Sequence, residues 1–129
     1  MNMIITGASS GVGFEAVIEL ILSGKHKVVA LARSQDKLER LLEIAHNLNP
    51  ECTLYAIAFD VVHDDYDSLQ QFIETNLDNR VDVLINNAGV LINKPFTQLL
   101  ESDFVEMLQS NFIGHVRMIQ GVLHLMPAG

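Results

Sequence analysis

A glycine-rich segment close to the N-terminus has the residue types and spacing of a phosphate-binding turn. Residues 6–13 read Thr6-Gly7-Ala8-Ser9-Ser10-Gly11-Val12-Gly13. Glycines allow a tight turn and a close approach of the backbone to a pyrophosphate, and the N-terminus of a following helix supplies free amides and partial positive charge. A glycine cluster alone also occurs in ordinary turns. This one stands between a predicted strand at 3–6 and a predicted helix at 12–22, which is the context that a nucleotide-binding fingerprint requires.

Two further motifs follow predicted strands and, with the first, resemble those of one family. Asp60-Val61 comes after the apolar run 53–59, and Asn86-Asn87-Ala88-Gly89 comes after the apolar run 81–85. The Gly-x-x-x-Gly-x-Gly spacing of the first motif differs from the usual dinucleotide pattern, and the three motifs together resemble the short-chain dehydrogenase/reductase family. The resemblance covers the whole chain but only about the first half of such a protein. It implies an oxidoreductase that transfers hydride to or from a carbonyl or alcohol substrate.

The resemblance also implies which residues bind the cofactor. In the family, the aspartate after the third strand contacts the adenine ring, and Asp60 stands at that place. The full set of cofactor-binding residues that we expect is Thr6, Gly7, Ser9, Ser10, Gly11, Val12, Gly13, Arg33, Ser34, Asp60, Val61, Asn87, Ala88 and Gly89.

Arg33 indicates which cofactor is preferred. It lies just past the predicted strand 27–32, in the loop that reaches the adenosine ribose in relatives. NAD-preferring members usually have an acidic residue at the strand end, where this chain has Ala32. A guanidinium can hold a 2′-phosphate through two hydrogen bonds, so we expect NADP(H) to be preferred, with NAD(H) as the alternative cofactor. The competing interpretation of Arg33 is a solvated side chain beside a helix start.

Asn111 is the one catalytic candidate. It occupies the place of the family's catalytic-site asparagine, which in relatives helps to hold a water of the proton relay. The alternative is an asparagine that bonds to a neighbouring carbonyl at a helix kink. Gly114, three residues later, favours a local irregularity in either case.

The acid of the family has no counterpart in these residues. It is a tyrosine followed four positions later by a lysine, which lowers the pKa of the tyrosine, with a serine upstream. Here Tyr55 is followed at that distance by Phe59, and Tyr66 by Gln70. We therefore expect this chain to be part of a longer oxidoreductase and to be inactive by itself. Two alternatives remain: a half-length module that binds a dinucleotide without turning it over, and a dimerising remnant that does not bind one.

The elements that must position these motifs alternate between strand and helix. Apolar runs predict strands at 3–6, 27–32, 53–59 and 81–85. Helical spacing predicts helices at 12–22, 35–48 and 65–77, and a mostly helical segment over 96–126. Such an order predicts an α/β fold, the first half of a Rossmann-like doubly wound parallel sheet with helices on both faces. We expect one NADP-binding domain over residues 1–129, truncated relative to the family. The strand 53–59 should be buried on both faces, and the strand 81–85 should be an unpaired edge.

The last predicted helix carries a long apolar stripe. Its members alternate at steps of three and four residues: Val105, Leu108, Phe112, Val116, Ile119, Leu123 and Met126. We expect this stripe to be a core face first and an interface second, because relatives pair this helix across a dimer. The predicted assembly is therefore a homo-oligomer formed through the C-terminal helix.

Composition excludes several other classes of function. The chain has 129 residues, an apolar fraction of 49% and a net charge of −8, which favour a folded domain and argue against nucleic acid as a partner. The single Cys52 fits a reducing compartment, and no apolar run has the length of a membrane span. We therefore expect a cytoplasmic protein without a membrane partner. The five histidines lack zinc-ligand spacing, so no metal site is predicted.

Overall fold

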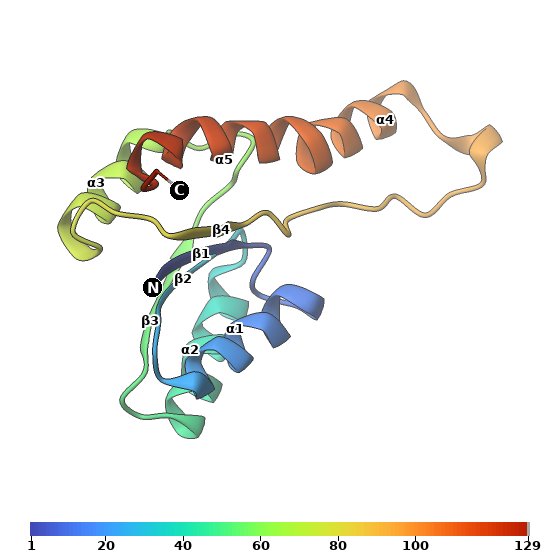
Figure 1. The fold of residues 1–129 in the computed structure, drawn as a ribbon. Coiled ribbons are helices and arrows are strands. Elements are labelled where there is room, and N and C mark those ends of the chain that lie inside the picture. Colours follow the sequence, from blue (N-terminus) through green and yellow to red (C-terminus); the bar gives the residue numbers. More distant parts are fainter. Residues whose placement is uncertain (129) are drawn as a thin grey trace.

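The computed structural model describes residues 1–128, and its centre is a parallel sheet of four strands with helices on both faces (Figure 1). The strands lie in the order β3-β2-β1-β4, so the order reverses between β1 and β4. In the register, Ile4 of β1 pairs with Val29 of β2 and with Leu84 of β4. The strands are β1 (Asn2–Thr6), β2 (Lys27–Ala32), β3 (Thr53–Ala58) and β4 (Val83–Ile85). The predicted α/β fold with a Rossmann-like parallel sheet is confirmed.

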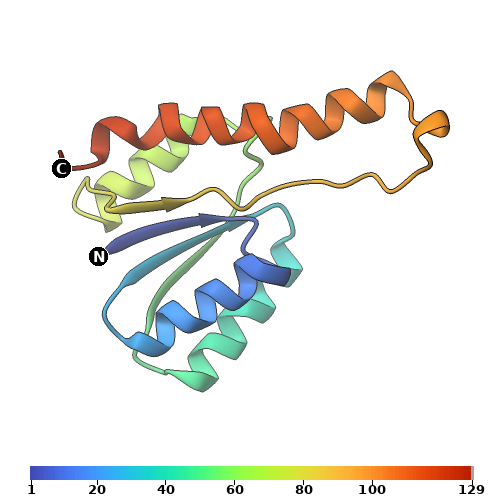
Figure 2. The same ribbon diagram turned by 45° about the vertical axis from the view of Figure 1, so that its right-hand side comes forward.

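The helices form one layer on each side of the sheet (Figures 1 and 2). On one side lie α1 (Gly11–Ser23) and α2 (Gln35–Leu48), and on the other lie α3 (Tyr66–Asn76) and α5 (Gly114–Val122). The remaining helix, α4 (Glu101–Leu108), continues the line of α5 beyond the carboxyl ends of the strands (Figure 2). Within residues 1–128, no helix has the length and apolar character needed to cross a membrane.

Local sequence signals set the ends of these helices. Gly24 closes α1 with a left-handed φ of 70°, which a residue without a Cβ adopts at little cost. The Ser34 hydroxyl accepts a hydrogen bond from the amide of Lys37 at 3.3 Å and so caps α2. Asp65 caps α3 in the same way, by accepting from the amide of Asp67 at 2.9 Å.

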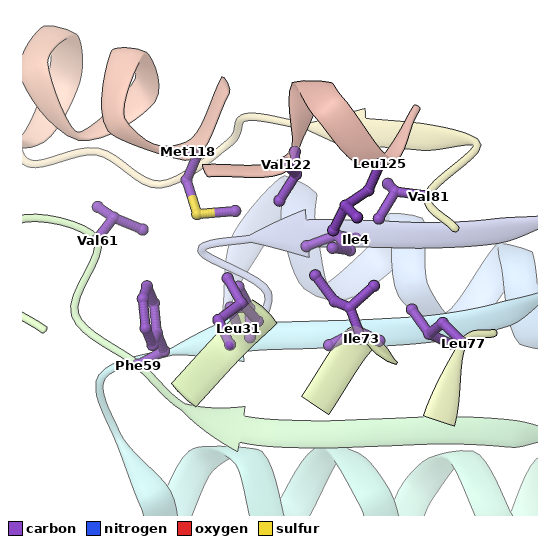
Figure 3. Packing of buried hydrophobic residues seen from close by; sticks show 12 residues of the cluster. Ile4, Leu31, Phe59, Val61, Ile73, Leu77, Val81, Met118, Val122 and Leu125 are labelled. Atoms are coloured by element: carbon purple, nitrogen blue, oxygen red, sulfur yellow. The ribbon is translucent and has the colours of Figure 1, made fainter. Parts of the chain in front are cut away.

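Each face of the sheet has its own apolar core. Ile5, Val17, Ile21, Leu38 and Leu41 lie between the sheet and the α1–α2 layer. On the opposite face, a second cluster lies between the sheet and the layer of α3 and α5 (Figure 3). That second cluster includes Ile4, Leu31, Phe59, Val61, Ile73, Leu77, Val81, Met118, Val122 and Leu125.

Two strand predictions need correction. The fourth strand begins at Val83 rather than at position 81, because the Val81 amide bonds to the Leu125 carbonyl at 3.0 Å and its side chain enters the core. The prediction that the third strand is buried on both faces is wrong. Of the residues in β3 only Leu54 is buried, because β3 is an edge strand that pairs with β2 alone. The other edge of the sheet in residues 1–128 is β4, as predicted.

The segment 96–126, predicted to be mostly helical, consists of several helical elements. A short 3-10 turn (Phe96–Gln98) precedes α4, a π-helix (Gln109–Ile113) joins α4 to α5, and a second 3-10 turn (Leu123–Leu125) follows. The π-helix is rare, occurs mostly as a single-turn bulge inside an α-helix, and often marks a functional site.

The prediction that the apolar stripe of this helix is a core face is also wrong. Six of its members are exposed: Val105, Leu108, Phe112, Val116, Ile119 and Leu123. The helix packs instead through a face that contains Gly114 and Gly121. A Cβ at Gly114 would lie 2.7 Å from Cγ2 of Val61, and one at Gly121 would lie 2.6 Å from Cδ2 of Tyr66. The close approach that these glycines permit brings Met118 into the core and turns the stripe outward.

Candidate functional site

A cleft of about 520 Å³ opens at the carboxyl ends of the strands. It lies where the strand order reverses, between the turn after β1 and the segment after β4, which is where ligands bind in open α/β sheets. Most of the predicted cofactor residues line it: Gly7, Ser9, Ser10, Arg33, Ser34, Asp60, Val61, Asn87, Ala88 and Gly89. The structure thus brings residues from four separate parts of the sequence to one site.

Thr6 does not line the cleft but joins two of its walls. Its side chain is 0% exposed. Its Oγ1 accepts hydrogen bonds from the amides of Asn87 at 3.0 Å and Ala88 at 2.9 Å. In return, Nδ2 of Asn87 donates to the Gly7 carbonyl at 3.1 Å. These three bonds join the glycine turn to the segment after β4.

Gly7 and Gly13 are required by this close approach. Gly7 has a φ of +63°, and a Cβ there would lie 2.8 Å from the Cα of Ala88. A Cβ at Gly13 would overlap both the Asn87 side-chain amide and the Gly7 carbonyl. The glycines therefore serve the packing of the turn against the β4 segment as well as any contact with a ligand.

The N-terminus of α1 has the features of an anion-binding site. Ser10 occupies the cap position without a side-chain hydrogen bond to the helix, and the first turn holds no acidic residue. The first amides of a helix lack intrahelical partners and carry the positive end of its dipole. Val12 in this turn is 79% exposed, and Gly11 has a φ of +57°. A phosphate group has open access to these amides.

Two cationic side chains line the cleft after β2. Arg33 follows β2 and is exposed, and Lys37 in the first turn of α2 lines the same cleft. The ion pairs among residues 1–128 are Arg80–Asp82 and Lys94–Asp103, so neither Arg33 nor Lys37 has a carboxylate partner there. Lys37 was not singled out in the sequence. Its signal would have been its position, one helical turn after Arg33.

Asp60 shapes the turn after β3. Its Oδ1 accepts from the amides of Val62 at 2.8 Å and His63 at 3.2 Å, and its own amide donates to Oδ2 of Asp64 at 2.7 Å. Val61 is buried beneath this turn. Asp60 and Val61 both line the cleft, and the hydrogen bonds of Asp60 stabilise the turn that carries them.

Asn111 lies in the π-helix, and it is not among the residues that line the cleft. Its Oδ1 accepts from the Val90 amide at 2.7 Å, and its Nδ2 donates to the Val90 carbonyl at 2.8 Å. Gly89 fits beside it, since a Cβ there would lie 2.8 Å from Oδ1. The side chain thus binds the backbone of the loop after β4 rather than a carbonyl of its own helix.

The other cleft residues come from positions that sequence motifs did not mark. They are Lys37, His63, Val90, Glu106, Gln109 and Ser110, together with Leu31 and Ala32 at the end of β2 and Phe59 and Val62 after β3. Glu106, Gln109 and Ser110 reach the cleft only because the last helix passes over it, which no local pattern reveals.

Tyr66 has a structural role. Its hydroxyl donates to the Val61 carbonyl at 2.8 Å, and its ring packs edge-on against Phe59 and beneath the guanidinium of Arg117. Burial raises the pKa of Tyr66 to about 12, although the charge of Arg117 opposes the rise. The phenol therefore keeps its proton at neutral pH and is unsuited to proton exchange.

Comparison with known proteins agrees with this geometry. The family model for short chain dehydrogenase matches residues 1–129. The chain is 32% identical over 126 residues to the fatty acyl-CoA reductase of Acinetobacter baylyi, covering 96% of this chain and 41% of that protein. It is 36% identical over 124 residues to human 17-beta-hydroxysteroid dehydrogenase type 1, covering 94% of this chain and 37% of that protein.

Solved structures show the same fold. The alcohol dehydrogenase of the archaeon Thermococcus sibiricus, complexed with 5-hydroxy-NADP, superimposes with a TM-score of 0.79 at 28% identity, over 96% of this chain and 52% of that one. A short-chain dehydrogenase from Streptomyces avermitilis has the same TM-score at 27% identity, over 96% of this chain and 43% of that one. The chain thus spans about half or less of the relatives that it matches. With the family model matching its whole length, the chain belongs to the short-chain dehydrogenase/reductase family.

Proposed function

We propose that this chain binds NADP(H) and forms the cofactor-binding part of an enzyme that transfers hydride to or from a carbonyl or alcohol. The observation that carries the proposal is the cleft itself, which is lined by the uncapped N-terminus of α1 and by two cations after β2 that form no ion pair within residues 1–128. These features match the two separated phosphate groups of NADP(H). The alcohol dehydrogenase of Thermococcus sibiricus, complexed with 5-hydroxy-NADP, supports the same cofactor class.

The residues present fit such a cofactor. The turn 7–13 would hold the pyrophosphate through backbone amides, because its glycines leave no Cβ in the way. Asp60 and Val61 would contact the adenine, and Arg33 and Lys37, with Ser34 between them, would hold the 2′-phosphate. The segment 87–89 would lie along the cofactor toward the nicotinamide, which supplies the chemistry of accepting or donating hydride.

Charge favours NADP(H) over NAD(H). A phosphate at the 2′ position would meet two cations that form no ion pair within residues 1–128. A charge-assisted hydrogen bond contributes about 1.5–3 kcal/mol, which corresponds to roughly a tenfold to hundredfold gain in affinity. Asn111 would act at the catalytic end, where its contacts with Val90 hold the loop between the cofactor segment and α4.

The exposed apolar stripe supports self-association as part of the same proposal. Large apolar side chains are exposed along a single face of the last helix, including Phe112 at 64% and Leu123 at 60%. A contiguous apolar surface of this kind marks an interaction site in a folded protein. A second copy of the same helix would cover it.

Titration calorimetry with NADPH and NADH tests the cofactor proposal. The change Arg33→Ala should weaken NADPH by roughly tenfold to a hundredfold and leave NADH nearly unaltered, because only NADPH carries the 2′-phosphate. Lys37→Ala should act in the same direction. The matched control is Arg40→Ala, which removes an exposed cation of α2 outside the cleft and should change neither affinity. Equal losses for both cofactors would show that Arg33 does not bind the 2′-phosphate.

Turnover is a separate question from binding. Neither Tyr55 nor Tyr66 is followed four positions later by a lysine, so the 129-residue chain should bind NADPH without oxidising it. The measurement is the absorbance of NADPH in the presence of a panel of ketones and aldehydes. Enzyme-dependent loss of absorbance in a contaminant-free preparation would contradict this expectation.

A further inference from the structure

We infer that His115 is a positioning residue of the cleft: it holds the Ala88–Gly89 peptide so that the Gly89 backbone is presented to the cofactor. The sequence motifs did not mark His115, and its role toward the cofactor rests on the proposed function. His115 lies in the first turn of α5 and is not itself among the residues that line the cleft.

His115 forms hydrogen bonds with the segment after β4, part of which lines the cleft. Its Nε2 lies 2.6 Å from the Ala88 carbonyl oxygen, so this nitrogen carries the proton and donates it. The backbone carbonyl of His115 accepts from Nδ2 of Asn86 at 3.3 Å. The same residue thus anchors the segment after β4 at two points, one through its ring and one through its main chain.

Ala88 is held from both sides. Its amide donates to Thr6 in β1 at 2.9 Å, and its carbonyl accepts from His115 in α5. The carbonyl of Ala88 and the amide of Gly89 belong to one planar trans peptide, in which the two groups point in opposite directions. Because His115 draws the carbonyl toward α5, the Gly89 amide must point away from α5.

The next residue along the loop supports this geometry. The amide and carbonyl of Val90 both bond to Asn111, one helical turn before His115. The Gly89 carbonyl and the Val90 amide belong to one planar trans peptide, so these two groups point in opposite directions. Because the Val90 amide donates to Asn111, the Gly89 carbonyl points away from Asn111. Gly89 is exposed, lines the cleft, and has no hydrogen-bond partner for its backbone within residues 1–128.

The role of His115 predicts a pattern of affinities that differs from that of Arg33. Both NADPH and NADH share the part of the cofactor that passes the segment 87–89. Loss of the His115 bond should therefore weaken both cofactors by the same factor, whereas loss of Arg33 should weaken NADPH alone. A net hydrogen bond contributes about 1 kcal/mol, so the expected factor is about fivefold.

Three variants of the 129-residue chain test the inference. His115→Phe keeps a ring of similar size but removes the donor, and His115→Gln restores a side-chain N–H donor. His46→Phe is the matched control, because His46 bonds to the Leu42 carbonyl at 2.8 Å on α2, outside the cleft. We expect His115→Phe to weaken NADPH and NADH about fivefold each, His115→Gln to recover most of the affinity, and His46→Phe to change neither.

Amide hydrogen exchange in the chain without cofactor gives a second, independent result. His115→Phe should speed exchange at Asn87 and Ala88, whose amides are held by Thr6, more than at the core amides of β2. A uniform rise at all amides, or unchanged affinity for both cofactors, would overturn the positioning role. If the unmodified chain binds neither cofactor, the proposed function fails. The exchange result then decides alone whether His115 orients the segment.

Discussion

Replacing Thr6 with valine should destabilise the chain without creating a cavity. Valine has nearly the shape of threonine, so the change removes little but the oxygen. That oxygen is fully buried and accepts the amides of Asn87 and Ala88 at 3.0 and 2.9 Å. After the change, the amides of Asn87 and Ala88 lose their acceptor, at the point where the glycine turn meets the segment after β4.

The magnitude follows from the cost of those two donors. A buried donor without a partner costs about 1–3 kcal/mol. Because the segment 87–88 is only half-buried, some water can reach it, so we take the lower part of that range for each amide. The expected loss in the free energy of unfolding is about 2–4 kcal/mol for Thr6→Val. Thr6→Ser keeps the oxygen and loses one methyl group, which should cost about 1 kcal/mol.

Urea unfolding of the three chains measures these values directly, provided that the slope of free energy against denaturant stays the same. Thr6→Val should show the larger fall in midpoint, and Thr6→Ser should stay close to the unmodified chain. If the two variants lose the same free energy, the hydroxyl does not hold the β4 segment. The account of Thr6 as the link between the two walls of the cleft would then be wrong.

Three further outcomes follow from the structure. The Leu100 amide and then Lys94 lower the pKa of Asp103, so Asp103 stabilises the fold above its unfolded pKa of about 3.9 and loses this contribution as pH falls below it. In urea unfolding, the difference in free energy of unfolding between the unmodified chain and Asp103→Asn should therefore become smaller as pH drops from 6 to 3. A difference that stays constant with pH would contradict this. Ile119→Glu should shift the chain toward monomer in sedimentation velocity, whereas the exposed control Asn47→Glu should not. An unmodified chain that is already monomeric would contradict self-association through the apolar stripe. Gly13→Ala should cost about 1–3 kcal/mol in thermal or urea unfolding, because its Cβ would overlap the side chain of Asn87. An unchanged free energy of unfolding would show that the glycine turn can shift to accommodate the added methyl group.

Much of the fold could be predicted from the sequence because its signals are local. Apolar runs marked the four strands, and Ser34, Asp65 and Gly24 mark helix ends that the structure retains. The element order then implied a parallel sheet. Motifs at the ends of strands could be placed together for the same reason, since the carboxyl ends of parallel strands share one edge. Ten of the predicted cofactor residues indeed line the cleft: Gly7, Ser9, Ser10, Arg33, Ser34, Asp60, Val61, Asn87, Ala88 and Gly89.

In the last helix, the periodicity of apolar residues could not determine which face is buried. Its sequence offers two apolar faces, and spacing alone favoured the longer one, with Val116 and Ile119, as the core. The structure buries the other, through Met118 and Val122. Glycines at 114 and 121 let that face approach Val61 and Tyr66 closely, and this fit depends on surfaces distant in sequence.

The sequence by itself determined the family, the order of strands and helices, and the motifs that meet at one edge of the sheet. Each of these depends on residues that are close together in the sequence. Tertiary structure alone decided which face of the last helix turns outward, that Lys37 joins Arg33 at the cleft, and that His115 and Asn111 hold the loop after β4. These contacts join residues brought together only by packing. Their physical basis is the fit between a helix and a loop, which no spacing along the chain encodes.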